Sequence, residues 1–184
     1  MTLMEKTGTP VGSYAPDFEL PGIDDRVHHL FDYLQNWQVI GVVFLSNHCP
    51  EVFTYLDRLK HIQAQFEHQG FTLVGINAND AQQDSEESFN NMKRFALEKQ
   101  LNFPYLWDST QDVAHGFGAE RTPEAFVIDR QGVLRYSGQI DDNPQEAKAV
   151  SVPYLQNAIV AVLSGQEVNP KSTKVNGCVI QWRQ

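Results

Sequence analysis

Apolar residues occur along the chain in short clusters whose spacing predicts alternating strands and helices. Residues 39–45 form a run of mostly branched apolar residues without polar alternation, which is typical of a strand buried on both faces of a sheet. Further strands are expected at residues 71–77, 103–106, 125–129 and 133–137. Apolar residues at helical spacing predict helices at residues 50–68, 89–97, 108–117 and 152–163. Asp108 or Ser109 is the expected N-cap of the third of these helices.

The N-terminal part favours a β-hairpin, since Phe18 and Leu20 alternate with acidic residues and a Pro21-Gly22 turn precedes a returning strand at residues 27–30. A short helical turn is expected to begin at Leu30. Strands that alternate with helices indicate an α/β fold, with a parallel core sheet, helices on both faces and an antiparallel edge from the last two strands. With no internal repeat or linker, residues 1–184 are expected to form one domain, on which a tail of residues 166–184 packs.

The composition of the chain argues against several classes of function. The chain has 184 residues, 41% of them hydrophobic, and a net charge of −9, which opposes nucleic-acid binding. No apolar run approaches the roughly 20 residues of a membrane span, and residues 1–10 show no secretory signal. Two cysteines do not make a disulfide scaffold, so we expect a cytoplasmic protein with catalytic or redox-sensing thiols. No spacing indicates a metal site or another cofactor, and Asp141 and Asp142 are expected in a solvated loop rather than as an acid pair.

Cys49 lies where the strand at residues 39–45 ends and the helix at residues 50–68 begins, and Pro50 suits the first helical position. The first amides of a helix have no intrahelical partner and carry partial positive charge, so they stabilise a thiolate. Because the thiolate is the nucleophilic form, Cys49 is the candidate catalytic residue. The alternative is an inert, half-buried cysteine.

Three segments together resemble the thioredoxin superfamily. They read V-G-S-Y-A-P-D-F-E-L-P-G, V-V-F-L-S-N-H-C-P-E-V and R-T-P-E-A-F-V-I-D-R-Q-G-V-L-R-Y-S-G-Q-I-D-D, and the ending G-C-V-I-Q-W adds to them. The chain is most similar to the redoxin branch, related to alkyl hydroperoxide reductase and the thiol-specific antioxidants, and to its peroxiredoxin-like subgroup with an N-H-C-P turn. The resemblance implies a thioredoxin-like fold, a central mixed β-sheet flanked by helices. It also implies a cis Thr122-Pro123 bond beside Cys49.

Two positions depart from the pattern of many relatives. Relatives often read C-N-H-C-P, where this chain has Ser46 as the first residue, and C-T-P, where it has Arg121. Local dithiol exchange needs two thiols at the turn, one to attack and one to release the mixed disulfide, so Ser46 removes that reaction. The remaining S-x-x-C-P resembles the T-x-x-C pattern of peroxiredoxins, in which the hydroxyl helps to hold the peroxide that the cysteine attacks.

Several residues near Cys49 have two interpretations. Ser46 could donate to a peroxide oxygen or cap the helix. His48 could lower the pKa of Cys49 when protonated, or point away from it. Arg121 could hold the thiolate in its charged form, as an arginine does in peroxiredoxins, or lie on the surface.

Cys178, in the C-terminal tail, has three interpretations. It could resolve an oxidised Cys49 by forming a disulfide, or pack in the core of the tail, or contact a neighbouring chain. Gly177 before it permits an unusual backbone conformation, which would help the tail to reach inward. Val179, Ile180 and Trp182 are expected to anchor the end of the tail.

The first functional hypothesis is a thiol-dependent oxidoreductase or peroxidase with antioxidant activity. The Cys49 thiolate would attack a small peroxide or a protein disulfide, and thioredoxin or glutathione would recycle it. The second hypothesis is a non-catalytic thioredoxin-like binding module that has lost dithiol chemistry and holds an extended peptide near Thr122 and Pro123. Neither hypothesis involves nucleic acid or a membrane, and both fit a monomer or a homodimer.

Overall fold

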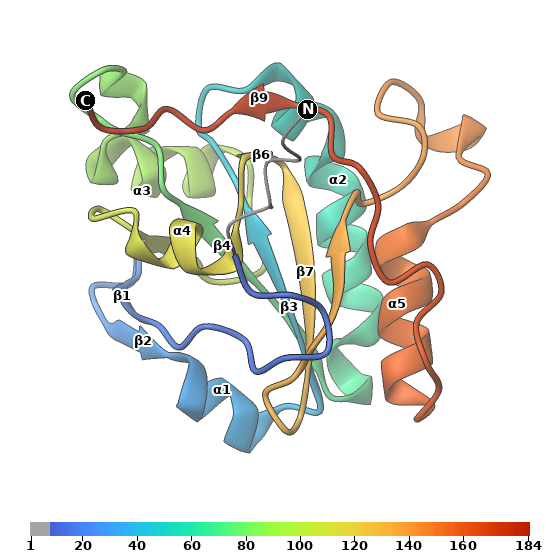
Figure 1. Cartoon of the computed structure of the whole chain (residues 1–184). Coiled ribbons are helices and arrows are strands. Elements are labelled where there is room, and N and C mark those ends of the chain that lie inside the picture. The colour runs from blue at the N-terminus through green and yellow to red at the C-terminus, as the bar shows by residue number, and fades with distance from the viewer. Residues whose placement is uncertain (1–7) are drawn as a thin grey trace, which may run out of the picture.

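The protein, whose computed structural model describes residues 8–184, has the α/β architecture that the sequence predicts (Figure 1). The strands are β1 (Glu19–Pro21), β2 (Val27–His29), β3 (Val39–Phe44), β4 (Phe71–Asn77), β5 (Tyr105–Trp107), β6 (Arg121–Thr122), β7 (Glu124–Asp129), β8 (Leu134–Gly138) and β9 (Cys178–Val179). The helices are α1 (Leu30–Asn36), α2 (Pro50–Phe66), α3 (Phe89–Glu98), α4 (Asp112–Phe117) and α5 (Tyr154–Leu163). Residues 1–10, in which the sequence shows no secretory signal, lie mostly outside the described residues.

The core sheet has the strand order β5-β4-β3-β7-β8. The central strand β3 runs parallel to β4 and antiparallel to β7, so that Val42 lies between Val74 and Phe126. All six residues of β3 are buried, which agrees with its unbroken apolar sequence. The predicted parallel core and antiparallel edge are therefore confirmed, and the sheet is mixed.

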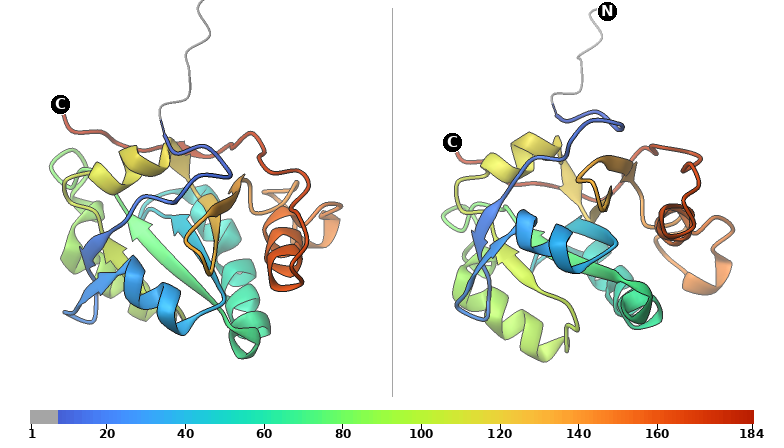
Figure 2. Two further views of the ribbon diagram at one scale, coloured as in Figure 1. Left: turned by 60° about the horizontal axis from the view of Figure 1, so that its bottom comes forward. Right: turned by 90° about the horizontal axis from the view of Figure 1, so that it is seen from below.

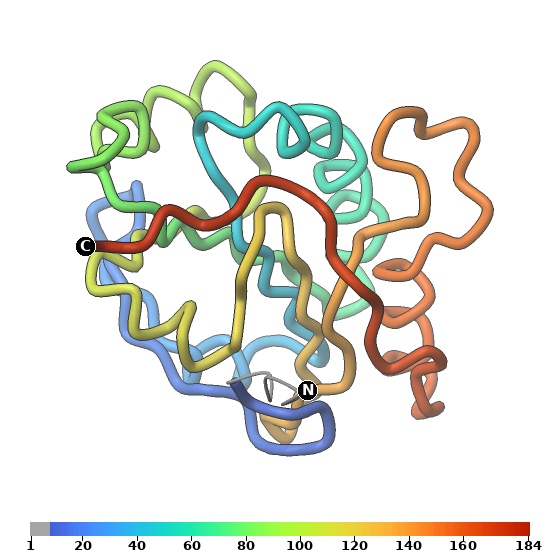
Figure 3. Tube along the Cα trace, turned by 45° about the horizontal axis from the view of Figure 1, so that its top comes forward, coloured from blue at the N-terminus to red at the C-terminus, as the bar shows by residue number. Residues whose placement is uncertain are grey.

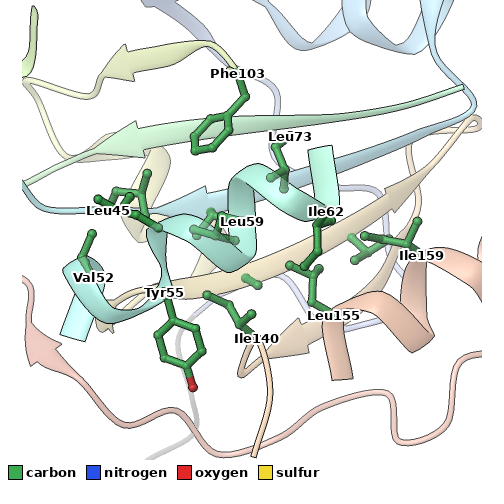
Figure 4. Close-up of a cluster of buried hydrophobic side chains, with 14 of the residues drawn as sticks. Leu45, Val52, Tyr55, Leu59, Ile62, Leu73, Phe103, Ile140, Leu155 and Ile159 are labelled. Atoms are coloured by element: carbon green, nitrogen blue, oxygen red, sulfur yellow. The ribbon is translucent and has the colours of Figure 1, made fainter. Parts of the chain in front are cut away.

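Successive residues of β3 point to opposite faces of the sheet. Val39 and Val43 pack with α2, α3 and α5 in one apolar cluster, part of which Figure 4 shows. Ile40 and Val42 pack with α1 and α4 in a second cluster on the other face. The sheet therefore lies between two helical layers (Figure 2). Among residues 8–184, no helix combines the length and the apolarity that crossing a bilayer requires.

The helix expected at residues 108–117 begins later than predicted, at Asp112, and the expected caps Asp108 and Ser109 are wrong. Asp108 is buried at the end of β5, and its carboxylate accepts a hydrogen bond from the amide of Ala114 at 2.8 Å. The chain then turns through Gln111, whose φ of 70° places it in the left-handed region. Asp108 thus binds the first turn of α4 from outside the helix.

The prediction of a solvated Asp141 is also wrong, because the residue is only 5% exposed. Its carboxylate accepts hydrogen bonds from Arg58 at 2.8 Å and from the hydroxyl of Tyr55 at 3.0 Å. Both partners belong to α2, so this buried ion pair ties the loop after β8 to the helix that follows Cys49. Asp142 is exposed, as expected.

Candidate active site

Cys49 lies where the sequence predicts it, between β3 and α2. It is the N-cap residue of α2, with extended backbone angles, and Pro50 is the first helical residue. The side chain is 1% exposed and belongs to the apolar cluster around α2. Its sulfur lies 3.5 Å from the carbonyl oxygen of Thr122. The position confirms the strand–cysteine–helix geometry that stabilises a thiolate at a helix start.

Cys49 forms a disulfide with Cys178, across a sequence separation of 129 residues and a Cα–Cα distance of 6.1 Å. Cys178 is partly exposed and packs at the margin of the same apolar cluster. Of the three interpretations of Cys178, the structure agrees with the first, in which Cys178 forms a disulfide with Cys49. The second thiol that the turn lacks at Ser46 therefore comes from the C-terminal tail.

A short two-stranded sheet holds Cys178 against the active-site turn. β6 pairs antiparallel with β9, with Thr122 opposite Cys178, and in Figure 1 β9 crosses above β6 beside the start of α2. The Thr122-Pro123 bond is cis, as the resemblance implied. Arg121 donates through Nη1 to the carbonyl oxygen of Gly177 at 2.8 Å. In this oxidised state Arg121 thus binds the tail, and contact with a free thiolate stays a prediction.

The tail, whose path across the molecule Figure 3 shows, is also anchored on both sides of Cys178. Before it, the hydroxyl of Thr173 contacts the hydroxyl of Tyr136 at 2.8 Å, and the Thr173 amide bonds to β8. After it, Ile180 is buried and Trp182 stacks on His115 with ring centroids 4.3 Å apart, whereas the expectation of Val179 as an anchor is wrong because Val179 is exposed. None of these contacts involves the disulfide. We therefore expect them to hold Cys178 near Cys49 when the disulfide is open.

Gly177 has a φ of 132°, which disfavours other residues, and a β-carbon there would clash with the carbonyl oxygen of Thr122. Gly177→Ala is therefore expected to displace Cys178 and to slow formation of the disulfide at least about tenfold, because even a displacement of about 1 Å lowers the rate of a positioned reaction. The rate of thiol loss after peroxide addition to reduced protein measures this effect.

Gly165→Ala is the matched control, because Gly165 also has a positive φ, of 69°, but open space around it. This variant shares the backbone strain and leaves the tail near Cys49 untouched. We expect it to form the disulfide at the wild-type rate. A Gly177→Ala protein as fast as Gly165→Ala would show that Gly177 does not position Cys178.

Ser46 and the buried carboxylate of Glu87 fix the turn before Cys49. The Ser46 hydroxyl donates to Glu87 and accepts from the amide of His48 at 3.0 Å. Glu87 is 2% exposed and also accepts from the amide of Asn47 at 3.0 Å and from Asn77 at 2.6 Å. The Ser46 hydrogen is thus directed to Glu87 in this state, and donation to a peroxide stays a prediction. No sequence pattern singles out Glu87, which lies outside the predicted helices and strands.

Tyr105 completes this network from the neighbouring strand β5. Its hydroxyl donates to the side-chain oxygen of Asn47 at 2.8 Å. Burial, together with the nearby charge of Glu87, raises the pKa of Tyr105 well above its ordinary value. The phenol therefore keeps its proton and serves as a fixed donor to the turn.

His48 is largely exposed, and its Nδ1 lies 2.7 Å from a carboxylate oxygen of Asp84. The hydrogen bond and the charge of Asp84 raise the pKa of His48 above its ordinary value of 6.5. His48 thus keeps its positive charge closer to neutral pH. Within the described residues no polar contact joins its ring to Cys49, so an effect on the thiol stays a prediction.

Asp84→Asn is expected to move the pKa of His48 back towards 6.5, because the charged partner is lost. Folding raises the pKa of His48, so the pair stabilises the fold fully at a pH below the pKa of His48 in the unfolded chain. This stabilisation is lost as the pH rises through the pKa of His48 in the folded protein. The variant should thus lose stability mainly on the acidic side, by a small amount, as befits an exposed pair. NMR titration of the imidazole tests this, with Asp80→Asn as the control.

A buried cysteine at a helix start, joined to a second cysteine beside a cis-proline loop in a thioredoxin-like fold, defines a thiol–disulfide redox protein. No group of three or more candidate metal ligands occurs in residues 8–184. The family comparison agrees with this class: the model of the AhpC/TSA family matches residues 11–137. The chain belongs to this family.

Two relatives that are similar in sequence carry the names of thiol–disulfide proteins. The chain is 27% identical over 131 residues to the thiol-disulfide oxidoreductase ResA of Geobacillus thermodenitrificans, covering 71% of this chain and 70% of that protein. It is 27% identical over 139 residues to the thiol:disulfide interchange protein DsbE of Escherichia coli, covering 73% and 68%. A hypothetical protein from Sinorhizobium meliloti has a similar structure, with a TM-score of 0.88, 34% identity and 96% coverage of both chains.

Proposed function

We propose that this protein is a two-cysteine oxidoreductase that cycles between the Cys49–Cys178 disulfide and the corresponding dithiol. The observation that carries the proposal is the disulfide itself, which links a cysteine at a helix start to one held by an anchored tail. The tail brings a second thiol to a turn that has only one. Dithiol exchange is therefore open to this chain even though Ser46 replaces the usual first cysteine.

In the reduced protein the amides at the start of α2 stabilise the Cys49 thiolate. With a protein disulfide as substrate, this thiolate would attack one sulfur and form a mixed disulfide. Cys178 would then attack Cys49, close the intramolecular disulfide and release the substrate as a dithiol. The names of the two curated relatives support this class of substrate.

A peroxide is the second candidate substrate, and the AhpC/TSA family match favours it. The Cys49 thiolate would attack one peroxide oxygen, become a sulfenic acid and expel the other oxygen as an alcohol or water after protonation. Cys178 would condense with the sulfenic acid, releasing water and forming the disulfide. In both schemes a cytoplasmic thiol such as thioredoxin or glutathione would restore the dithiol, and this reductant and location rest on the sequence alone.

Rapid mixing of fully reduced protein with hydrogen peroxide or with a peptide disulfide tests the proposal, with thiol loss and mass spectrometry of Cys49 as readouts. We expect the protein to lose two thiols per substrate molecule in at least one of the two reactions, and the peptide disulfide to gain two thiols where it is the substrate. Cys49→Ser, which keeps the size of the side chain, should be inert in both. If neither substrate oxidises the wild type faster than Cys49→Ser, the protein is a thioredoxin-like binding module and the proposal is wrong.

A further inference from the structure

Two buried side-chain amides, those of Asn79 and Gln111, bind the main chain of the tail just after Cys178. We call these two residues the amide clamp. Gln111 donates through Nε2 to the carbonyl oxygen of Gln181 at 2.9 Å, and its Oε1 accepts from the amide of Arg183 at 3.0 Å. The Oδ1 of Asn79 accepts from the amide of Gln181 at 2.9 Å. The tail takes part through main-chain atoms, so these contacts do not depend on the side chains that it carries there.

Contacts with the body of the protein orient both amides of the clamp. Nε2 of Gln111 also donates to the carbonyl oxygen of Ala78 at 2.7 Å, so both hydrogens of this nitrogen are engaged. The left-handed backbone of Gln111 is uncommon for a residue other than glycine and persists where surrounding contacts require it. Asn79 donates through its main-chain amide and Nδ2 to Oδ1 of Asn77 at 3.0 and 3.1 Å. Its own Oδ1 is thereby left for the tail.

The hydrogen bonds of the clamp continue to the turn before Cys49. Asn77, at the end of β4, donates through Nδ2 to Glu87 at 2.6 Å, and Glu87 accepts from the hydroxyl of Ser46. Asn77 also accepts from Asn79. One connected set of hydrogen bonds therefore positions the segments that carry the two halves of the disulfide.

The clamp matters because the tail needs a defined register. β6 and β9 have only two residues each, and a slip by one residue would turn the side chain of Cys178 to the opposite face. Ile180 and Trp182 hold the tail through apolar and ring contacts, and apolar burial is non-directional. Hydrogen bonds are directional, so the clamp fixes which residue of the tail lies opposite Thr122.

We propose that Asn79 and Gln111 are positioning residues for the Cys49–Cys178 couple. In the dithiol form the amide clamp holds the tail in register, keeps Cys178 beside Cys49 and so sets the effective concentration of its thiol. This assignment rests on the proposed function, because it concerns closure of the disulfide in that cycle. Without the clamp the dithiol form populates arrangements of the tail in which Cys178 cannot reach Cys49, and closing the disulfide must reverse them.

Equilibration of the full-length protein in buffers of reduced and oxidised glutathione tests the proposal. The dithiol transfers two electrons and two protons to oxidised glutathione, so that the Cys49–Cys178 bond forms and two molecules of reduced glutathione are released. After quenching with acid and N-ethylmaleimide, mass spectrometry gives the equilibrium constant between the two forms. A contact that only stabilises the fold does so equally in both forms and leaves this constant unchanged.

Two variants weaken the clamp from opposite sides. Gln111→Gly removes the amide and suits the left-handed backbone. Gln181→Pro removes the N–H that Asn79 accepts, at an exposed position of the tail. Each should lower the constant at least about tenfold, because the dithiol form loses hydrogen bonds that keep the tail docked. A tenfold fall corresponds to a reduction potential about 30 mV higher.

Gln181→Ala is the matched control, because it changes the same exposed side chain and keeps both main-chain groups. Its constant should stay within about twofold of the wild type, as for an ordinary surface substitution. Constants of Gln181→Pro and Gln181→Ala that agree with each other would overturn the proposal, and so would an unchanged constant in Gln111→Gly. Should Gln111→Gly fail to fold, the comparison of the two variants at Gln181 decides.

The equilibrium requires no turnover of substrate, so its outcome is separate from that of the proposed function. A protein that no substrate oxidises, but whose constant falls in Gln181→Pro and not in Gln181→Ala, would refute the cycle and leave the clamp in place. A protein that turns over and shows the same constant in all variants would refute the clamp alone.

Discussion

Cys178→Ser is expected to stop the redox cycle after the first attack of Cys49. The variant lacks the thiol that closes the disulfide, so each turnover must wait for an outside thiol. Because a positioned intramolecular thiol has a large effective concentration, turnover with a dithiol reductant should fall by about 100-fold or more. The first step needs only Cys49, so its rate should not change. Steady-state turnover and single-turnover oxidation of Cys49 measure the two effects separately.

Val179→Ser is the control for this variant, because it changes the neighbouring exposed side chain in the same strand and keeps both cysteines. It should retain most of the wild-type turnover. Equal turnover of Cys178→Ser and wild type would mean that Cys49 works as a one-cysteine enzyme and that the disulfide plays no part in catalysis.

Opening the disulfide is expected to lower the free energy of unfolding by about 2–4 kcal/mol, as is typical of disulfides that close long loops. The bond spans 129 residues, so its loss greatly increases the conformational freedom of the unfolded chain. For a chain of this size the melting temperature should fall by about 5–15 °C. The anchors of the tail do not depend on the disulfide, so the reduced protein should stay folded.

Thermal unfolding with and without a phosphine reductant measures this difference. Cys178→Ser provides the control, because it should melt near the reduced wild type and not respond to the reductant. A wild type whose melting temperature is unchanged on reduction would show that the disulfide does not cross-link the folded protein in solution.

The sequence alone was sufficient for the main strands of the core sheet and for the position of Cys49 between a strand and a helix, because both depend on local patterns. The apolar runs of β3 and β4 and the helical spacing after Pro50 indicate a cysteine between a buried strand and a helix start. These elements hold most of the core, so the α/β class follows from them. The start of α4 was predicted wrongly because Asp108 is not its N-cap but binds the amide of Ala114 from a buried position outside the helix, which local preferences do not indicate.

The partners within the site depend on contacts between distant segments, which no local pattern reveals. Glu87 lies 41 residues from Ser46 and outside the predicted helices and strands, so no local pattern indicates their hydrogen bond. The sequence around Asp141 predicts a solvated loop, although Asp141 is buried and accepts a hydrogen bond from Arg58 of α2. The pairing of Cys178 with Cys49 was one of three interpretations, since only the docking of the tail on β6 selects it.

The most direct test of a Cys49–Cys178 redox couple is non-reducing peptide mapping of reduced protein treated with one equivalent of hydrogen peroxide. The two-cysteine cycle predicts a single cross-linked peptide pair that contains Cys49 and Cys178, with two thiols lost for each peroxide consumed. An oxidised Cys49 beside a free Cys178, with no cross-link formed, would contradict it.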